Sequence, residues 1–110
     1  MIIKKGKKII AKDAILISSF IRQMIGLRFS KQKNLIFDFK KEKKEVIDMF
    51  FVCYPIDLIF LDKDKKVIEL KRNFRPFEFY KNKKPARYMI ELKNNSIKEK
   101  SIVIGDKIEF

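Results

Sequence analysis

The residue whose surroundings most suggest chemistry is Asp57, a carboxylate inside the apolar run from Pro55 to Phe60. An ionised carboxylate in such a run must be paired with a cation or must accept backbone N–H bonds. Asp57 is therefore either a buried acid or base, or a structural acceptor that holds the turn after Pro55, with Arg22 or Arg87 as its partner. The sequence offers no second group for acid–base catalysis, and this favours the structural interpretation.

The other residue types that carry enzyme chemistry are scarce. Histidine is absent from the 110 residues, and Cys53 is the one cysteine. The chain therefore lacks histidine-activated nucleophiles, histidine metal ligands and an internal disulfide. Cys53 is predicted to be a small buried hydrophobic residue. Asp62 and Asp64 are predicted to form a charged hairpin tip, because the glycine and the terminal glutamate of a calcium loop are missing. We predict no catalytic residue, no metal site and no cofactor, and an enzyme is the less favoured interpretation.

A second candidate is the segment from Arg72 to Lys84, in which aromatic and basic residues interleave. Proteins that bind single-stranded nucleic acid stack bases on such rings, while cations hold the phosphates. The residues that would do this here are Arg72, Arg75, Phe77, Phe79, Tyr80, Lys81, Lys83 and Lys84. The structural alternative is that Phe77 and Phe79 share one strand face and enter the core, with Glu78 pointing outward.

The net charge of +13 comes from 27 lysines and arginines against 14 acidic residues. Only five of the basic residues are arginine, and lysine and isoleucine are both encoded by AT-rich codons. The excess is therefore either compositional drift or a true polyanion-binding surface. In both cases we expect weak, salt-sensitive binding to nucleic acid.

Short strands are the elements that must position these residues. β-branched and aromatic runs separated by turn residues predict them at 2–3, 9–11, 14–17, 35–39, 46–54, 56–62, 66–70, 77–80, 86–92, 102–104 and 108–110. Residues 40–45 are predicted to be a loop. A short helix is expected near residues 19–25, where serines precede an apolar pattern that ends at a glycine, and a helical turn is expected at residues 96–100.

Residues 49–54 are apolar on both faces, unlike a strand with one face in water. They predict either a central strand covered on both sides or a strand with one face lining an apolar concavity. In the second case the candidate pocket residues are Arg22, Met49, Phe51, Asp57 and Arg87. Along the strand at 86–92, Arg87 and Glu91 are predicted to be surface or cross-strand charges, while the alternate residues from Ala86 to Leu92 face the core.

Together these patterns predict a single mainly β domain over residues 1–110, a small barrel or sandwich of short, mostly antiparallel strands with the one short helix. The predicted buried residues include Leu35, Phe37, Phe50, Val52, Ile59, Tyr88 and Ile90. The longest apolar stretch, residues 49–61, is too short and too interrupted to span a membrane, and no signal-peptide cleavage site follows the N-terminal lysines. We expect a cytoplasmic protein that is a monomer or a weak dimer.

Several segments, in their order and spacing, carry a family resemblance over residues 18–110. Residues 26–30, Gly-Leu-Arg-Phe-Ser, are similar to a Gly-Leu-Met-Phe-Arg motif, and residues 35–39, Leu-Ile-Phe-Asp-Phe, are similar to the Leu-x-Phe-x-Phe strand that follows it. Residues 55–62, Pro-Ile-Asp-Leu-Ile-Phe-Leu-Asp, are similar to Pro-Leu-Asp-x-Ile-Phe-x-Asp. Residues 85–92 and 104–108 match the closing strands. This set of motifs resembles the uncharacterised family called domain of unknown function 192.

The chain departs from many bacterial members of that family. They carry Trp-Met-Lys-Asn-Thr before the Pro-Leu-Asp motif, whereas residues 48–52 here are Asp-Met-Phe-Phe-Val, as in the archaeal-like branch. Asn94 and Asn95 stand where the family usually has glycine, and asparagine tolerates the left-handed turn. The resemblance implies a small β barrel or sandwich with a short helix, and it implies no function.

Two functional hypotheses therefore remain. The first is a non-catalytic binding or accessory module that uses an apolar concavity near Met49 to Asp57 for a small molecule or a protein partner. The alternative is a basic β module that binds nucleic acid through surface lysines and the segment from Phe74 to Tyr80.

Overall fold

Strands dominate the structure, as the sequence predicts. The computed structural model describes residues 1–18, 33–49 and 54–110. Its elements are β1 (Ile3–Lys5), β2 (Lys8–Ala11), β3 (Ile15–Ile17), β4 (Leu35–Lys43), β5 (Val46–Asp48), β6 (Ile56–Leu61), β7 (Val67–Phe74), β8 (Phe79–Lys81), β9 (Ala86–Lys93) and α2 (Ser96–Glu99). The mainly β class is confirmed. The described sheets stay open, so barrel or sandwich is only a loose description of them.

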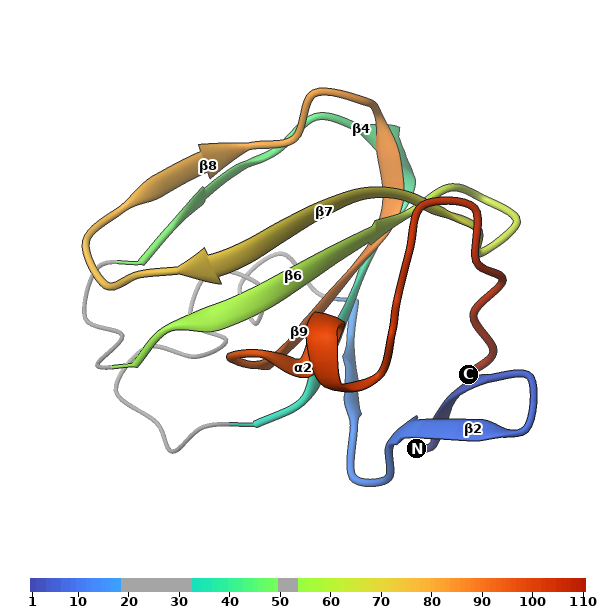
Figure 1. The fold of residues 1–110 in the computed structure, drawn as a ribbon. Helices are drawn as coiled ribbons and strands as arrows, with labels where there is room; N and C mark the ends of the chain where they lie inside the picture. Colours follow the sequence, from blue (N-terminus) through green and yellow to red (C-terminus); the bar gives the residue numbers. More distant parts are fainter. Residues whose placement is uncertain (19–32, 50–53) are drawn as a thin grey trace.

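The largest sheet has five strands in the order β3-β4-β9-β6-β7 (Figure 1). Strands β4, β9, β6 and β7 pair antiparallel, and β3 joins β4 in parallel. Two further antiparallel pairs, β1–β2 and β5–β8, form separate two-stranded sheets. The prediction of mostly antiparallel pairing is therefore confirmed.

Strand β6 is buried along its whole length, because both of its faces are covered. Its residues belong to two apolar clusters, with Ile56, Leu58 and Phe60 in one and Ile59 and Leu61 in the other. A strand buried on both faces has a near-continuous apolar sequence. The sequence predicted this property for residues 49–54. However, β5 ends before them at Asp48, and residues 50–53 lie outside the described part of the chain.

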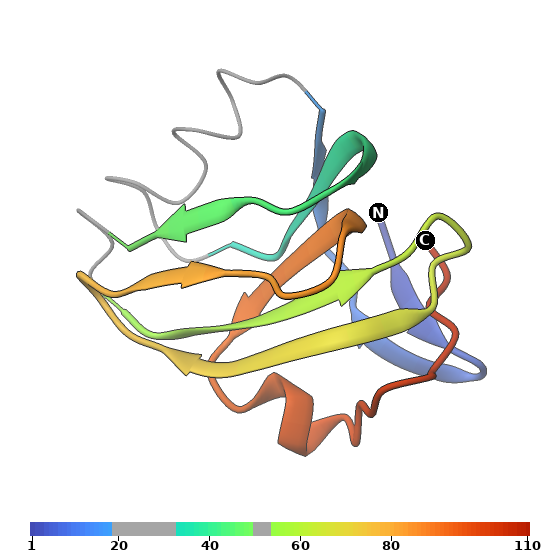
Figure 2. The same ribbon diagram turned by 90° about the horizontal axis from the view of Figure 1, so that it is seen from above.

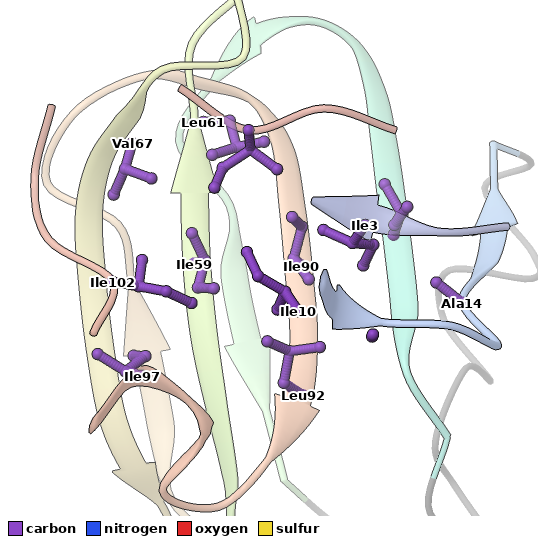
Figure 3. Close-up of a cluster of buried hydrophobic side chains, with 13 residues drawn as sticks. Ile3, Ile10, Ala14, Ile59, Leu61, Val67, Ile90, Leu92, Ile97 and Ile102 are labelled. Carbon is purple, nitrogen blue, oxygen red and sulfur yellow. The ribbon is translucent and has the colours of Figure 1, made fainter. Parts of the chain in front are cut away.

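The two faces of the sheet are covered by different parts of the chain. On one face, the β1–β2 hairpin, α2 and the segment after it pack over Ile59, Ile90 and Leu92 (Figure 3). On the other face lies the β5–β8 pair, above the sheet in Figure 1 and toward the viewer in Figure 2. We call this pair the β5–β8 layer. Its Tyr80 ring packs against the Phe60 and Phe74 rings, with centroid distances of 5.9 and 6.3 Å.

Backbone hydrogen bonds join the N-terminal hairpin to the end of the chain. The N–H of Lys4 donates to the carbonyl of Glu109, and the N–H of Glu109 donates back to the carbonyl of Lys4, each at 2.8 Å. Figure 1 shows the two termini close together. A second isolated bridge joins Lys66 and Lys107. The prediction of strands at residues 102–104 and 108–110 is wrong. Ile104 lies in a turn, and in the last three residues only Glu109 forms a β-bridge, its single bridge to Lys4.

The remaining predicted helices, hairpin and loop are confirmed in part. The helical turn at residues 96–100 is confirmed as α2, and the hairpin at residues 62–66 is confirmed between β6 and β7. Strand β4 continues to Lys43 through residues predicted to be a loop, because Lys43 still pairs with Ala86 after a break in register. The helix expected near residues 19–25 lies outside the described residues. Within the described residues no helix is long and apolar enough to cross a membrane.

The predicted core is largely the observed one. Leu35, Phe37, Ile59 and Ile90 are buried, and Phe50 and Val52 lie outside the described residues. Tyr88 is only partly buried. Its ring packs edge-on against the ring of Phe110 at a centroid distance of 5.2 Å, near the surface.

Candidate functional site

Asp57 is a structural acceptor. Its side chain is 1% exposed. One carboxylate oxygen accepts the N–H of Asn73 and the other accepts the N–H of Ile97, each at 3.0 Å. Helix α2 has no side-chain cap of its own, since Asn95 precedes it in a left-handed conformation with φ of 74°. Asp57 therefore caps the helix from β6, and the prediction of a buried, backbone-bonded carboxylate is confirmed.

The other predicted pocket residues do not gather around Asp57. Arg87 pairs with Asp38, with 2.7 Å between its Nε and a carboxylate oxygen, and this contact lowers the pKa of Asp38 against the opposing effect of burial. Met49 is buried in the cluster on the face that carries the β5–β8 layer, whereas Asp57 turns toward α2 on the opposite face. Arg22 and Phe51 lie outside the described residues. A pocket built from these residues stays a prediction.

The hairpin tip between β6 and β7 is held by its own carboxylate. An oxygen of Asp62 accepts the N–H groups of Asp64 and Lys66 at 2.9 and 3.0 Å, which is a turn and not a metal loop. Across residues 1–18, 33–49 and 54–110, no group of three or more histidine, cysteine, aspartate or glutamate side chains could hold a metal ion.

A groove of about 300 Å³ runs beside the edge strand β7. It is lined by Ile68, Glu69, Leu70, Arg72, Tyr80, Lys83, Lys84 and Ile104. We call it the β7–β8 groove. It brings together four of the residues that the sequence singled out for nucleic acid, namely Arg72, Tyr80, Lys83 and Lys84.

Glu69 organises the wall of this groove. Its side chain is 8% exposed, and its carboxylate accepts the N–H of Lys83 at 2.8 and 3.0 Å, the N–H of Lys84 at 3.1 Å and the hydroxyl of Tyr80. Burial and the neighbouring Glu69 raise the pKa of Tyr80 to about 12, so the hydroxyl remains a donor. Because the negative charge of Glu69 is engaged by these donors, the groove presents the exposed cations of Arg72, Lys83 and Lys84 to a ligand.

Sequence reasoning missed Glu69. An acidic residue between Ile68 and Leu70 has the alternation of a solvent-facing position on a half-buried strand, so the sequence carried no signal of its burial.

The prediction that Phe77 and Phe79 enter the core is wrong, because their side chains are 64% and 63% exposed. Phe77 lies in the turn before β8 with a left-handed φ of 66°, so it does not share a strand face with Phe79. Along β8 the alternation places the Tyr80 ring inward and leaves Phe79 and Lys81 outward. Arg75 is exposed in the same turn, where its N–H donates to the carboxylate of Glu78 at 2.7 Å.

The prediction that Glu91 is a surface or cross-strand charge is also wrong. Its side chain is 5% exposed, and its Oε2 has no hydrogen-bond partner in the described part of the chain. Its cross-strand neighbours are Leu35 on β4 and Leu58 on β6, both apolar. Burial raises the pKa of Glu91 to about 8. The alternation of Glu91 with Arg87 along β9 is typical of a solvent-facing side. However, other parts of the chain cover this side at Glu91, and its carboxyl is therefore buried.

Comparison with known proteins identifies relatives of this chain. The family model described as "Uncharacterized ACR, COG1430", which is domain of unknown function 192, matches residues 1–110. A UPF0127 protein of Pyrococcus furiosus is 32% identical over 111 residues, which cover 98% of this chain and 94% of the relative.

Two solved structures have a similar fold. A protein from Sinorhizobium meliloti is 22% identical with a TM-score of 0.82, and the match covers 87% of this chain and 79% of the other. A protein of unknown function from Novosphingobium aromaticivorans is 22% identical with a TM-score of 0.81, and the match covers 88% of this chain and 74% of the other. At this identity the likeness concerns the fold alone.

Proposed function

Because the chain belongs to the uncharacterised family domain of unknown function 192, we propose its function from its own surface: it is a binding module that holds single-stranded nucleic acid in the β7–β8 groove. The observation that carries this proposal is the meeting of Arg72, Lys83 and Lys84 with the ring of Tyr80 in one groove. The net charge of +13 supports it, because a basic protein attracts polyanions over long range.

The lining of the groove suits the two parts of a nucleotide. The apolar side chains of Ile68, Leu70 and Ile104 offer contact to a base, and the exposed cations suit phosphates. A volume of about 300 Å³ accommodates a ligand about the size of one nucleotide. A duplex keeps its bases stacked inside, so an unpaired strand is the better fit.

A nucleic acid strand leaving the groove would pass over the outer side of the β5–β8 layer. Phe79 and Lys81 are exposed there on β8, next to Tyr80. An exposed ring beside a cation is the combination that stacks a base and holds a phosphate, and it supports a binding path longer than one nucleotide.

This proposal takes precedence over the small-ligand hypothesis for a geometric reason. The described members of the pocket predicted near Met49 to Asp57 are buried or engaged elsewhere, whereas Arg72, Lys83 and Lys84 line one groove and are exposed. Binding of a small molecule or a protein near Met49 stays a prediction.

The test is fluorescence anisotropy with labelled single-stranded and duplex oligonucleotides. The variant Arg72→Gln/Lys83→Gln/Lys84→Gln removes the three groove cations. The matched control Lys7→Gln/Lys12→Gln/Lys41→Gln removes the same charge from exposed lysines outside the groove. We expect single-strand affinity to fall at least tenfold in the groove variant and less than about threefold in the control, with a smaller salt slope between about 50 and 200 mM in the groove variant.

Equal losses in the two triple variants would overturn the proposal, because binding would then follow total charge. Tighter binding of the duplex than of the single strand would overturn it too. A second arm compares Phe79→Ala with Val46→Ala, two exposed apolar positions on paired strands. We expect only the former to weaken binding of oligonucleotides longer than a few nucleotides.

A further inference from the structure

Glu91 lies in a row of residues that crosses the sheet. The row runs from Leu35 on β4 through Glu91 on β9 and Leu58 on β6 to Lys71 on β7. Residues directly opposite one another share a face of a sheet. Leu35 and Leu58 belong to the apolar cluster that also holds Phe60 and Phe74, so the Glu91 carboxyl points to the face on which the β5–β8 layer packs.

The pair formed by Met89 and Phe60 links Glu91 to the β5–β8 layer. Met89, two residues before Glu91 on the same face of β9, pairs with Phe60, and the Phe60 ring contacts the Tyr80 ring of the layer. A diagonal neighbour of this kind is within reach of a long side chain. Glu91 and the Phe60–Tyr80 contact therefore lie on the same face of the sheet, as near neighbours.

None of the charged groups that the structure describes near Glu91 pairs with its carboxyl. On β9, Arg87 is engaged by Asp38 and Lys93 is exposed. On β7 the ammonium of Lys71, two strands away, lies 5.6 Å from the centre of the Tyr80 ring, and Glu69 is engaged by Tyr80 and the Lys83 and Lys84 N–H groups. Strands β3 and β6 bring only apolar side chains to this face, and so does β4 from Leu35 to Phe39. Glu91 forms no ion pair within the described residues.

The layer is also attached less firmly than the strands of the five-stranded sheet. The β5–β8 pair is not hydrogen-bonded into the five-stranded sheet, and each of its strands has three residues. A two-stranded sheet of this length is not stable by itself. It is held by the Tyr80 ring contacts and by the hydrogen bonds to Glu69.

We propose that Glu91 is a proton-operated switch: the β5–β8 layer stays closed on the sheet while the carboxyl holds its proton, and the layer opens when the proton leaves. A buried carboxylate with no partner among the described residues is stabilised by water, and movement of the layer that packs on this face admits water to it. The raised pKa of Glu91, about 8, places the change in mildly alkaline solution. Because the layer carries Tyr80 and leads to Lys83 and Lys84, opening also weakens the groove. That last effect rests on the proposed function, whereas the switch itself does not.

The experiment begins with the carbon-13 NMR titration of the Glu91 carboxyl in the wild-type protein, which should show a midpoint near pH 8. Amide hydrogen exchange is then compared between wild type and Glu91→Gln at pH 6 and pH 9. We expect the amides of Ile47 and Tyr80 to exchange at least tenfold faster in wild type at pH 9, with equal rates at pH 6. The amides of Ile59 and Ile90 in the sheet should change little. The exposed Glu99→Gln variant is the control and should behave as wild type.

A titration midpoint below pH 6, or equal exchange in wild type and Glu91→Gln at pH 9, would overturn the switch. If Glu91→Gln does not fold, the wild-type titration and the wild-type comparison of Tyr80 with Ile59 decide the question. If the amide exchange rates of Ile47 and Tyr80 depend on Glu91 as expected, but no oligonucleotide binds at pH 6, the proposed function fails and the switch stands. If an oligonucleotide binds equally at pH 6 and pH 9 although the layer opens, the link to the groove fails.

Discussion

Asp57 and Glu91 occupy neighbouring positions of one ladder, and they meet opposite conditions. Asp57 pairs with Leu92 and Glu91 pairs with Leu58, so a single residue step separates the two carboxylates and places them on opposite faces of the sheet. Both are almost fully buried. Asp57 accepts two backbone N–H groups, and Glu91 Oε2 has no partner among the described residues.

The difference comes from the backbone around each residue. Near Asp57 the chain is irregular: Asn73 has a left-handed φ of 52° and α2 begins after Asn95, so each supplies an N–H that no strand partner uses. Around Glu91 the backbone belongs to regular ladders, whose N–H groups are already paired, and the side chains are apolar. A buried carboxylate is therefore satisfied where secondary structure ends and is left unsatisfied where it continues.

Replacing Asp57 should have the largest effect. In Asp57→Ala, one buried and one partly buried N–H group lose their acceptor, and we expect a loss of about 2–5 kcal/mol in the free energy of unfolding, measured by urea denaturation. The control is Asp64→Ala in the exposed hairpin tip, where we expect a change within about 0.5 kcal/mol. A small effect at Asp57 would mean that water replaces the carboxylate, and the contrast with Glu91 would disappear.

The pH dependence of stability comes next. The pKa of Glu91 is raised in the folded state from 4.5 to about 8, so its contribution is complete below pH 4.5 and is lost as the pH rises toward 8. Between pH 5 and pH 7 we expect this effect to lower the free energy of unfolding by roughly 2–3 kcal/mol. Urea denaturation across that range should show the decline in wild type and a flat profile in Glu91→Gln.

Asp38 and Asp106 have the opposite effect on the pH dependence of stability, and their effect lies in a more acidic pH range. Their hydrogen bonds and neighbouring cations lower both pKa values from 3.8, in spite of burial, so their contribution is present above that value and is lost in more acidic solution. A decline between pH 5 and pH 7 that persists in Glu91→Gln would show that another group is responsible.

Glu91→Leu sharpens the comparison from the opposite side. It removes a buried oxygen that has no partner in the described part of the chain and puts an apolar side chain of similar size in its place, so we expect the protein to gain about 1–2 kcal/mol at pH 7. The thermal midpoint should rise, and its pH dependence should shrink. A destabilised variant would indicate that the carboxyl has a partner that its burial conceals.

Glu69 is the intermediate case, since its acceptors are satisfied partly by a side chain. Tyr80→Phe removes the hydroxyl donor and leaves the N–H groups of Lys83 and Lys84, so we expect a loss of about 1 kcal/mol. Tyr88→Phe is the matched control, because the Tyr88 hydroxyl donates to no acceptor within the described residues. An equal loss in the two variants would mean that the bond to Glu69 contributes nothing.

The sequence predicts Asp57 well and Glu91 badly, for one physical reason. Asp57 stands within a continuous apolar run, which by itself shows burial on both faces of the strand. Glu91 stands in the alternation Arg87-Met89-Glu91, which is the pattern of a solvent-facing side. That face is covered by segments distant in sequence, and periodicity within one strand carries no information about them.

The sequence indicated which basic and aromatic residues could form the groove, but not how the fold arranges them. The interleaved bases and rings from Arg72 to Lys84 indicated the candidate residues, and the structure brings half of them into the groove. The division between Tyr80 inward and Phe79 outward depends on where β8 begins, and the left-handed Phe77 sets that point. Mainly β class and strand positions followed from residue patterns, while the single bridges near the chain end depended on tertiary contacts.

The paired hydrogen bonds between Lys4 and Glu109 also bear on the order of folding. They join residues separated by nearly the whole sequence, and closing so long a loop in a disordered chain is unfavourable until other contacts have shortened it. Contacts of high sequence separation form slowly. We therefore expect the β1–β2 hairpin to dock after the five-stranded sheet has formed, and to be among the first parts to detach when the protein is pulled or heated.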